Sequence, residues 1–217
     1  MSLRDDLVIA NHILAKHGVV DGFGHVSVRH EQHPDRFILA RNIAPALVTL
    51  DDLLEFDLDG NPVAPDGPRV YLERFIHSEI YRRRPDVVAV VHHHSPSVIP
   101  FGVTGAALRP IYHMSGFLGA GVPVFDIRCD AGDTDMLIRT PALGVAHACC
   151  LGDGAATLMR GHGATVVGGS LQQAVYRAVY MEMNARLQSD AMRLGDVTYL
   201  TQAEAQLAAA TIDGQVQ

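Results

Sequence analysis

Three consecutive histidines, His92, His93 and His94, close an apolar run over residues 87–91. The run consists of four valines and an alanine, which predicts a strand buried on both faces. Because side chains alternate across a strand, His92 and His94 would project to one side and His93 to the other. Two imidazoles on one face can chelate a divalent cation. A solvated strand end, or histidines hydrogen-bonded within a core, would show the same pattern.

Two further residues could complete such a metal site. His162 stands between Gly161 and Gly163, which free the backbone and clear space, so that the imidazole can point into a cavity. A tight turn with an exposed histidine is the alternative. Glu73 stands at the start of a predicted helix, where its interaction with the helix dipole could also explain a carboxylate. Three histidines and one carboxylate suit zinc, manganese, iron or cobalt, and the ligand types alone do not choose among them.

The composition excludes several classes of function. The 217 residues are 48% hydrophobic and 19% charged, as in a soluble globular domain with a substantial core. No apolar run reaches membrane-spanning length and the N-terminal segment lacks the layout of a signal peptide, so we expect a cytoplasmic protein without a membrane partner. A net charge of −7 argues against nucleic acid as the main partner. Lys16 is the only lysine, which leaves Schiff-base chemistry with almost no candidate residue.

Hydrophobic periodicity and turn signals predict a mixture of helices and strands. We expect helices over residues 3–17, 72–84, 133–150 (interrupted by Pro141 and Gly144), 171–187 and 201–210, and a short helix or turn over residues 96–101. We expect strands over residues 25–29, 37–40, 51–58, 87–91, 109–114, 122–127, 155–159 and 164–167. Nothing marks a domain boundary, and several strands meet at tight turns. The sequence therefore predicts a single α/β domain over residues 1–217 with a largely antiparallel sheet.

Taken together, these residues resemble the class II aldolase/adducin family, which contains the L-fuculose-phosphate and L-ribulose-phosphate enzymes. The matching pieces follow the family's order and spacing over roughly residues 3–190 and are Phe23-Gly24-His25-Val26-Ser27, Tyr71-Leu72-Glu73-Arg74-Phe75-Ile76-His77, Arg84-Pro85-Asp86, His92-x-His94 and Gly161-His162-Gly163. The resemblance implies a three-layer α-β-α fold and a homotetramer with active sites at subunit interfaces. It also implies that His92, His94 and His162 bind a metal, and that Glu73 either ligates it or acts as acid/base.

The chain departs from the sugar-phosphate members of the family where they bind phosphate. Those members use an Asn after the first glycine, a Thr/Ser-Gly pair and two serines just before the glutamate. This chain has His25, Arg41-Asn42 and Tyr71-Leu72 in those places. The loss of hydroxyls and small residues removes the cradle that a phosphate requires. Arg41 and His25 could instead hold a carboxylate or phenolic oxygen, and we expect His25, Arg41, Asn42 and Tyr71 to bind the substrate.

A second departure concerns the catalytic tyrosine of the sugar-phosphate aldolases. This chain has His113 in that place, with Tyr112 one residue earlier. An imidazole transfers protons near neutral pH, which a phenol with a pKa near ~10 cannot do as readily. A structural hydrogen bond is the alternative for His113. The expected catalytic residues are therefore Glu73, His113 and Tyr112.

The family chemistry uses a metal, chelated by adjacent substrate oxygens, to stabilise the enolate formed when a neighbouring C–C bond breaks. A pocket with an aromatic wall and an arginine that binds a carboxylate would suit the loss of CO2. In this the chain resembles the family's decarboxylases of hydroxylated aromatic or pyridine dicarboxylates and of ring-cleavage products. We therefore expect a zinc- or manganese-dependent decarboxylase (iron or cobalt being possible) of such a non-phosphorylated small-molecule carboxylate, with a role in aromatic catabolism. The alternatives are an aldolase acting on a non-phosphorylated 2-keto-4-hydroxy acid or sugar and, remotely, a non-catalytic adducin-like module. The tail over residues 195–217 could cover a neighbouring active site or pack as a surface helix.

Overall fold

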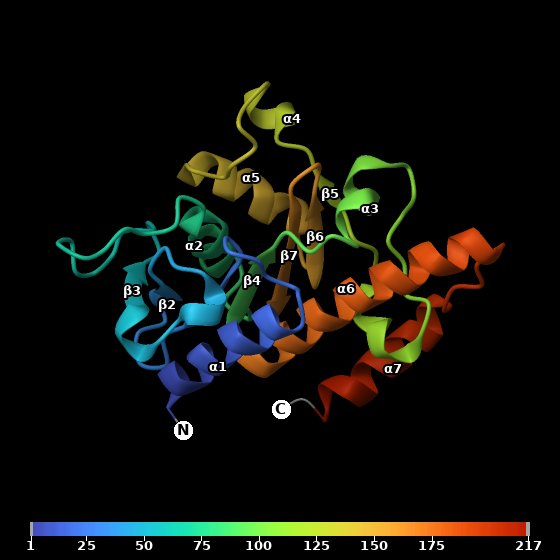
Figure 1. Ribbon diagram of the computed structural model, residues 1–217, viewed down its shortest axis with the longest axis horizontal. Helices are drawn as coiled ribbons and strands as arrows, with labels where there is room; N and C mark the ends of the chain where they lie inside the picture. Colours follow the sequence, from blue (N-terminus) through green and yellow to red (C-terminus); the bar gives the residue numbers. More distant parts are fainter. Residues whose placement is uncertain (1, 216–217) are drawn as a thin grey trace.

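A seven-stranded sheet forms the centre of the computed structural model, which describes residues 2–215 (Figure 1). The strands are β1 (His25–Arg29), β2 (Arg36–Ala40), β3 (Leu53–Asp57), β4 (Ala89–His93), β5 (Val124–Phe125), β6 (Ala156–Met159) and β7 (Gly163–Gly168). They lie in the order β3-β2-β1-β4-β7-β6-β5, and every neighbouring pair is antiparallel except β5 and β6. This confirms the expected α/β fold with a largely antiparallel sheet.

Helices cover both faces of the sheet. They are α1 (Leu3–Lys16), α2 (Arg74–Arg83), α3 (Ile99–Val103), α4 (Arg128–Ala131), α5 (Pro141–Leu151), α6 (Leu171–Leu194) and α7 (Gln202–Asp213), with the 3₁₀ helices η1 (Pro45–Leu47), η2 (Leu50–Asp52) and η3 (His113–Leu118). One apolar core joins α1 and α6 to the sheet and includes Val91, and the other joins α2 and α5 to the opposite face and includes Val90. Because consecutive residues of β4 enter different cores, the sheet is the middle layer of a three-layer α-β-α arrangement.

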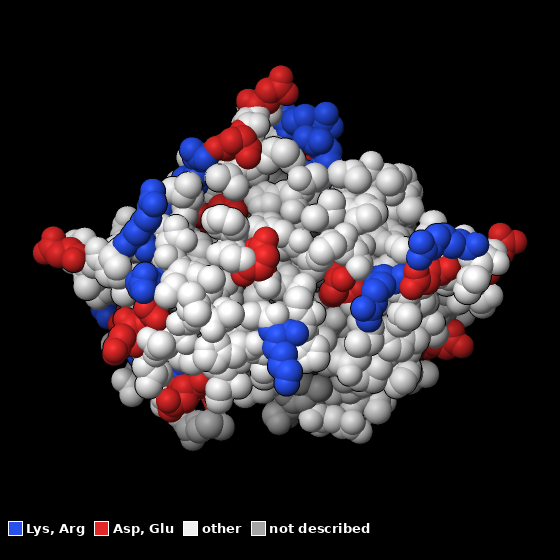
Figure 2. All heavy atoms as spheres, viewed as in Figure 1, with Lys and Arg blue, Asp and Glu red and all other residues white. Residues whose placement is uncertain are grey.

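The surface shows no concentration of one charge on the face drawn in Figure 2, where Lys and Arg side chains are scattered among Asp and Glu. Within residues 2–215, no helix is long and apolar enough to cross a membrane.

The predicted helix over residues 133–150 is wrong in its first half, because α5 begins only at Pro141. Thr140 is extended and caps the helix by accepting a hydrogen bond from the Leu143 amide. A residue before proline is disfavoured in the α region, whereas proline suits the first helical position. In the segment before it, Thr134 and Asp135 side chains accept backbone N–H groups, which competes with helix formation.

The predicted strand over residues 109–114 is also wrong, although its first part is extended. Its backbone pairs with side chains of α6 instead of with another strand. The Asn184 carboxamide accepts from the Ile111 amide and donates to the Arg109 carbonyl, and the Gln188 carboxamide accepts from the Arg109 amide. Both side chains are fully buried. One helical turn of α6 therefore replaces the partner strand, and the chain continues into η3.

The C-terminal helix α7 packs against η3. Glycines make this close contact possible, because a Cβ on Gly116 or Gly119 would overlap Ala205 of α7. Arg177 of α6 also pairs with Asp213 at 3.2 Å. Within one chain, α7 therefore belongs to the same layer as α6 and η3.

Candidate metal centre

Glu73, His92, His94 and His162 converge, and their four ligand atoms lie within 4.8 Å of one another. The Nε2 atom of His94 lies 3.0 Å from Nε2 of His92 and 3.1 Å from Nε2 of His162. Oε2 of Glu73 lies 3.5 Å from His92 Nε2 and 3.4 Å from His162 Nε2. A tetrahedral zinc site with bonds of 2.0–2.1 Å has ligand–ligand distances of about 3.3 Å. The residues fit a divalent cation of this size.

The sheet brings these ligands together. His92 lies in β4 and His94 directly follows the strand, so both project to the same side, while β4 pairs with β7, which begins one residue after His162. Gly161 has a φ of 61°, a left-handed conformation that glycine adopts without strain. A Cβ on Gly163 would overlap the carbonyl oxygen of His93. The two glycines are therefore needed for the turn that places His162 over the strand.

Glu73 is the N-cap residue of α2, but its side chain makes no capping hydrogen bond. Its Oε1 instead accepts from the Ile138 amide at 2.9 Å, and Oε2 faces the histidines. Burial opposes ionisation of Glu73, but the contacts with His162 and His92 outweigh it and lower its pKa well below the usual range. The carboxylate is therefore ionised, and it faces the histidines instead of capping the helix.

The histidines differ in their electrostatics. Burial lowers the pKa of His92 to about 4, against the opposing effect of Glu73. For His162, burial acts in the same direction, but Glu73 outweighs it and raises the pKa above its usual value. A neutral imidazole is the form that binds a metal. His92 is therefore neutral at physiological pH without a metal. At His162, a proton and a metal cation compete for the imidazole.

Two ligand histidines have hydrogen-bond partners behind them. Nδ1 of His94 lies 3.4 Å from Oδ1 of Asp21, which also accepts from the Phe23 and Gly24 amides. Nδ1 of His162 lies 3.0 Å from the Met136 carbonyl oxygen. Such partners orient a ligand imidazole and fix its tautomer. Neither Asp21 nor Met136 was predicted from the sequence. An Asp before a Gly-Phe-Gly turn was the available signal for the first, and a backbone carbonyl leaves none.

His25 belongs to a buried hydrogen-bonded chain. Its Nδ1 lies 2.6 Å from Nε2 of His77, whose Nδ1 lies 2.6 Å from Ser27 Oγ, and Ser27 Oγ lies 2.8 Å from the Tyr81 hydroxyl. Burial lowers the pKa of His77 to about 3 and that of His25 well below its usual range, so both rings are neutral. No role was predicted from the sequence for Ser27, His77 or Tyr81. Polar residues within apolar stretches were the signal that could have found them.

Of the expected substrate-binding residues, His25 lies beside the candidate ligand His92, and Tyr71 lies beside His25. The His25 ring lies 5.0 Å from that of His92 and 4.5 Å from that of Tyr71, measured between centroids. The Tyr71 hydroxyl donates to the Ile43 carbonyl, and burial raises its pKa to about 12, so Tyr71 offers a neutral ring face. The positive charge of Arg41 opposes this effect and acts to lower the pKa of the phenol.

Arg41 is half-exposed, and its Nε donates to Asp52 Oδ1 at 2.6 Å. Within residues 2–215 this is the one hydrogen bond of the Arg41 side chain, and its two terminal amino groups have no hydrogen-bond partner there. Asn42 is half-buried, and its amide donates to the Arg69 carbonyl at 2.8 Å.

Tyr112 and His113 are not brought to the cluster within one chain. They lie at the start of η3, which packs on α6 and α7, and within the described residues no hydrogen bond or ring contact joins them to the four ligands. Their rings meet edge to face at 6.1 Å. Burial raises the pKa of Tyr112 to about 12, so this phenol is neutral.

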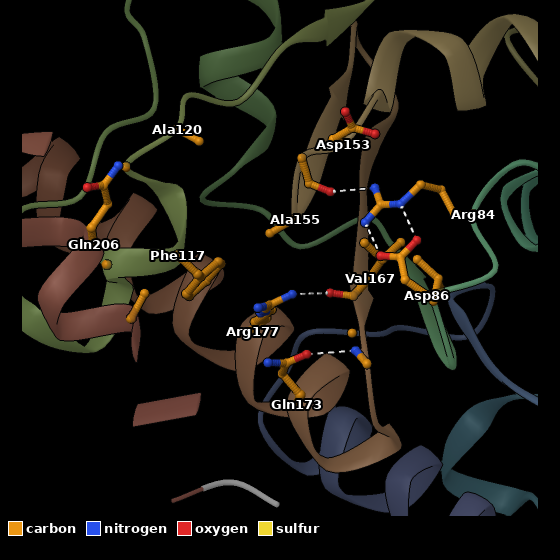
Figure 3. A pocket seen from close by; sticks show the side chains of 17 residues that line it. Arg84, Asp86, Phe117, Ala120, Asp153, Ala155, Val167, Gln173, Arg177 and Gln206 are labelled. Carbon is orange, nitrogen blue, oxygen red and sulfur yellow. Dashed lines mark hydrogen bonds and ion pairs between the residues drawn. The ribbon is translucent and has the colours of Figure 1, made fainter. Parts of the chain in front are cut away.

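A separate hollow of about 430 Å³, shown in Figure 3, lies at the other end of the sheet. Its lining includes Gly168, which pairs with Ala89 at the start of β4, whereas the ligand histidines lie at the end of that strand. In this hollow Arg84 pairs with Asp86 at 2.7 Å and Arg177 donates to the Val167 carbonyl at 2.9 Å, whereas the side chain of Asp153, which also lines it, has no hydrogen bond or ion pair within residues 2–215. The hollow is thus distinct from the metal centre, and its two arginines are already engaged.

Comparisons with known proteins identify the family. Residues 5–189 match the class II aldolase and adducin N-terminal domain. The chain is 46% identical over 196 residues to the decarboxylase tropJ of Talaromyces stipitatus, covering 84% of this chain and 74% of that protein. It is 33% identical over 199 residues to 3,4-dihydroxyphthalate decarboxylase of Arthrobacter keyseri, covering 85% and 76%. The structure superimposes on L-fuculose 1-phosphate aldolase from Glaciozyma antarctica with a TM-score of 0.79 and 25% identity, over 95% of this chain and 79% of the other. The chain is a member of the class II aldolase and adducin family.

Proposed function

We propose that this protein is a metal-dependent decarboxylase of a hydroxylated aromatic or heteroaromatic dicarboxylate, or of a ring-cleavage product, without a phosphate group. The observation that carries the proposal is the convergence of Glu73, His92, His94 and His162 beside His25 and Tyr71. Relatives named as decarboxylases, one of them of 3,4-dihydroxyphthalate, support the reaction type and the substrate class.

The four ligands would hold zinc or manganese, with iron or cobalt as alternatives, because nitrogen and oxygen donors suit all of these metals. The cation would supply Lewis-acid stabilisation of the negative charge that develops on substrate oxygens as CO2 leaves. The ionised Glu73 and the neutral His92 are already in the protonation states that ligands need.

Arg41 and Tyr71 would select and orient the substrate. Asp52 holds the Nε side of the Arg41 guanidinium, which leaves its terminal amino groups for a substrate carboxylate. The ring of Tyr71 would form an apolar wall for an aromatic substrate, since its hydroxyl is bound to Ile43. His25 would present its free ring edge to a phenolic or carboxylate oxygen, with Asn42 beside Arg41 as a further polar contact.

The reaction replaces a C–C bond by a C–H bond, so a residue must deliver a proton to the carbon that CO2 leaves. The electron pair of the broken bond remains on the substrate and takes up this proton. Glu73 is ionised and bound in the cluster, which makes it a ligand and leaves the donor role to His113, packed against Tyr112. Because η3 lies on α6 and α7 of its own chain, we assign His113 to the site of a neighbouring protomer in a homotetramer.

The tail over residues 195–217 would act on that neighbouring site through η3. Helix α7 packs on the segment that begins with His113, so it would hold the proton donor in place. Residues 216–217 lie outside the described part of the chain.

Elemental analysis of the purified protein, paired with a CO2-release screen over hydroxylated aromatic dicarboxylates and their ring-cleavage products, tests the proposal. We expect CO2 release that a chelator abolishes and that added manganese or zinc restores. Bound metal without CO2 release would contradict the decarboxylase and favour the aldolase. The superposition on an aldolase supports that second candidate, and pyruvate with a series of aldehydes would test it. A protein without metal would contradict both the decarboxylase and the aldolase and would favour the non-catalytic adducin-like module.

A further inference from the structure

The segment between α4 and α5, residues 133–140, contacts two of the four ligands through its backbone. We call it the 133–140 strap. The amide of Ile138 donates to Oε1 of Glu73 at 2.9 Å, and the carbonyl oxygen of Met136 lies 3.0 Å from Nδ1 of His162. Ile138 is fully buried, so this end of the strap is fixed in the core. Two main-chain groups only two residues apart thus reach ligands from different layers of the fold.

Met136 adopts a conformation that L side chains rarely occupy. Its φ is 69°, the one positive value of a non-glycine residue within residues 2–215. Neighbouring side chains hold the turn: Thr134 Oγ1 accepts from the Met136 amide at 2.9 Å, and Asp135 Oδ1 accepts from the Leu137 amide at 3.3 Å. Backbone strain that the surroundings maintain is characteristic of functional sites. In this turn, the residue with the unusual φ is also the one whose carbonyl points toward His162.

We propose that the 133–140 strap is a positioning element of the metal centre. This inference rests on the proposed metal site and deepens it. The Met136 carbonyl can only accept a hydrogen bond, so it fixes the proton of the neutral His162 ring on Nδ1. The lone pair of Nε2 then faces His94 Nε2, 3.1 Å away, and Glu73 Oε2, 3.4 Å away.

The same strap determines how Glu73 can bind. Ile138 occupies Oε1, so that Oε2 alone is turned toward the histidines and the carboxylate serves as a one-oxygen ligand. Partners of this kind change metal affinity by about 10- to 100-fold when they are lost. The strap therefore sets both the tautomer of one ligand and the denticity of another without supplying a ligand atom itself.

Substitutions at position 136 separate backbone conformation from side-chain loss. Asparagine and glycine accept a positive φ, whereas a β-branched residue does not. We expect Met136→Ile to weaken Zn²⁺ binding, measured by competition with a chromophoric chelator, by about 10- to 100-fold. Met136→Asn and Met136→Gly should stay within about threefold of the parent because both keep the turn. Met192→Ile, at an exposed methionine of α6, is the matched control. Equal affinities of Met136→Ile and the parent would overturn the proposal.

A second measurement needs no variant and covers the case in which Met136→Ile does not fold. Long-range ¹⁵N–¹H correlation spectra of the metal-free parent, at alkaline pH where the ring is neutral, report the tautomer of His162. We expect the proton on Nδ1, and a proton on Nε2 would overturn the proposal. Zinc binding by the parent tests the metal site separately: a parent that binds no zinc contradicts the proposed function, while the tautomer still decides whether the strap orients His162.

Discussion

Asp21 supports His94 from the side opposite to the metal centre: Oδ1 of Asp21 lies 3.4 Å from Nδ1 of His94. The same oxygen accepts hydrogen bonds from the amides of Phe23 and Gly24, which fixes the carboxylate at the end of the turn that leads into β1. The pKa of Asp21 is lowered: burial acts against ionisation, but these amides and His94 outweigh it. A metal-ligating histidine backed by an ionised carboxylate is a stronger and better oriented ligand.

Asp21→Ser should weaken metal binding by about 10- to 100-fold, because the shorter side chain can still accept from the turn amides but does not reach His94. Asp21→Asn keeps an acceptor of the same length and should lose less. Chelator competition measures both, with Asp66→Ser in an exposed loop as control. If Asp21→Ser bound zinc as tightly as the parent, Asp21 would only shape the turn.

Arg41 is expected to act on substrate binding rather than on the chemical step. Arg41→Lys keeps the charge but loses the fork that matches a carboxylate, so we expect KM to rise about tenfold with kcat nearly unchanged. Steady-state kinetics of CO2 release measure both constants, and Arg83→Lys on the exposed end of α2 is the matched control. A fall in kcat at unchanged KM would place Arg41 in the chemistry instead.

Mixed oligomers test whether His113 serves a neighbouring site. His94→Ala should lose its metal, whereas His113→Ala should keep it and lose only CO2 release. When the two inactive variants are mixed in equal amounts and reassembled, sites that combine residues of two protomers should recover roughly a quarter of the parent activity. If all catalytic residues came from one chain, the mixture would stay inactive.

We expect His147 to make the stability of the fold depend on pH, separately from metal binding. It is fully buried, neither ring nitrogen has a hydrogen-bond partner within the described residues, and burial lowers its pKa to about 3. Below pH 6.5 the unfolded chain binds a proton here and the folded chain does not, so the free energy of unfolding decreases as the pH falls toward 3. His147→Leu removes this loss.

Chemical denaturation in the presence of a chelator measures that effect. Relative to the parent, His147→Leu should gain about 1.4 kcal/mol more at pH 5.5 than at pH 8, the value for one proton with an unfolded-state pKa of 6.5. An equal difference between the two proteins at both pH values would show that His147 is protonated in the folded state as well.

The convergence of His92, His94 and His162 could be predicted from the sequence because their spacing follows the local geometry of a strand and a glycine turn. His92 and His94 share a side of β4, and the glycines around His162 are required by the close approach of that turn to β4. The antiparallel sheet was likewise predictable from tight turns between apolar strands. In these cases, one local rule and the tertiary structure favour the same arrangement.

The orienting groups behind the ligands could not be predicted, since two of them are main-chain atoms. The amide of Ile138 and the carbonyl of Met136 exist at every residue, so side-chain types do not mark them. The helical pattern over residues 133–150 even predicted the wrong conformation for this segment. The strand prediction for residues 109–114 was wrong for a related reason. An extended segment usually pairs with another strand, but here the side chain of Asn184 supplies the hydrogen bonds instead.

That use of Asn184 and Gln188 in place of a strand also constrains the order in which the chain can acquire its structure during synthesis. Residues 107–111 emerge from the ribosome about 75 residues before the carboxamides that bind their backbone, as the sequence separations of 73 and 79 show. Until α6 is complete, the Arg109 and Ile111 amides have no native partner, whereas β1, β2 and β4 already can pair. We therefore expect the amides of Arg109 and Ile111, just before His113, to be among the last to become protected from hydrogen exchange on the nascent chain.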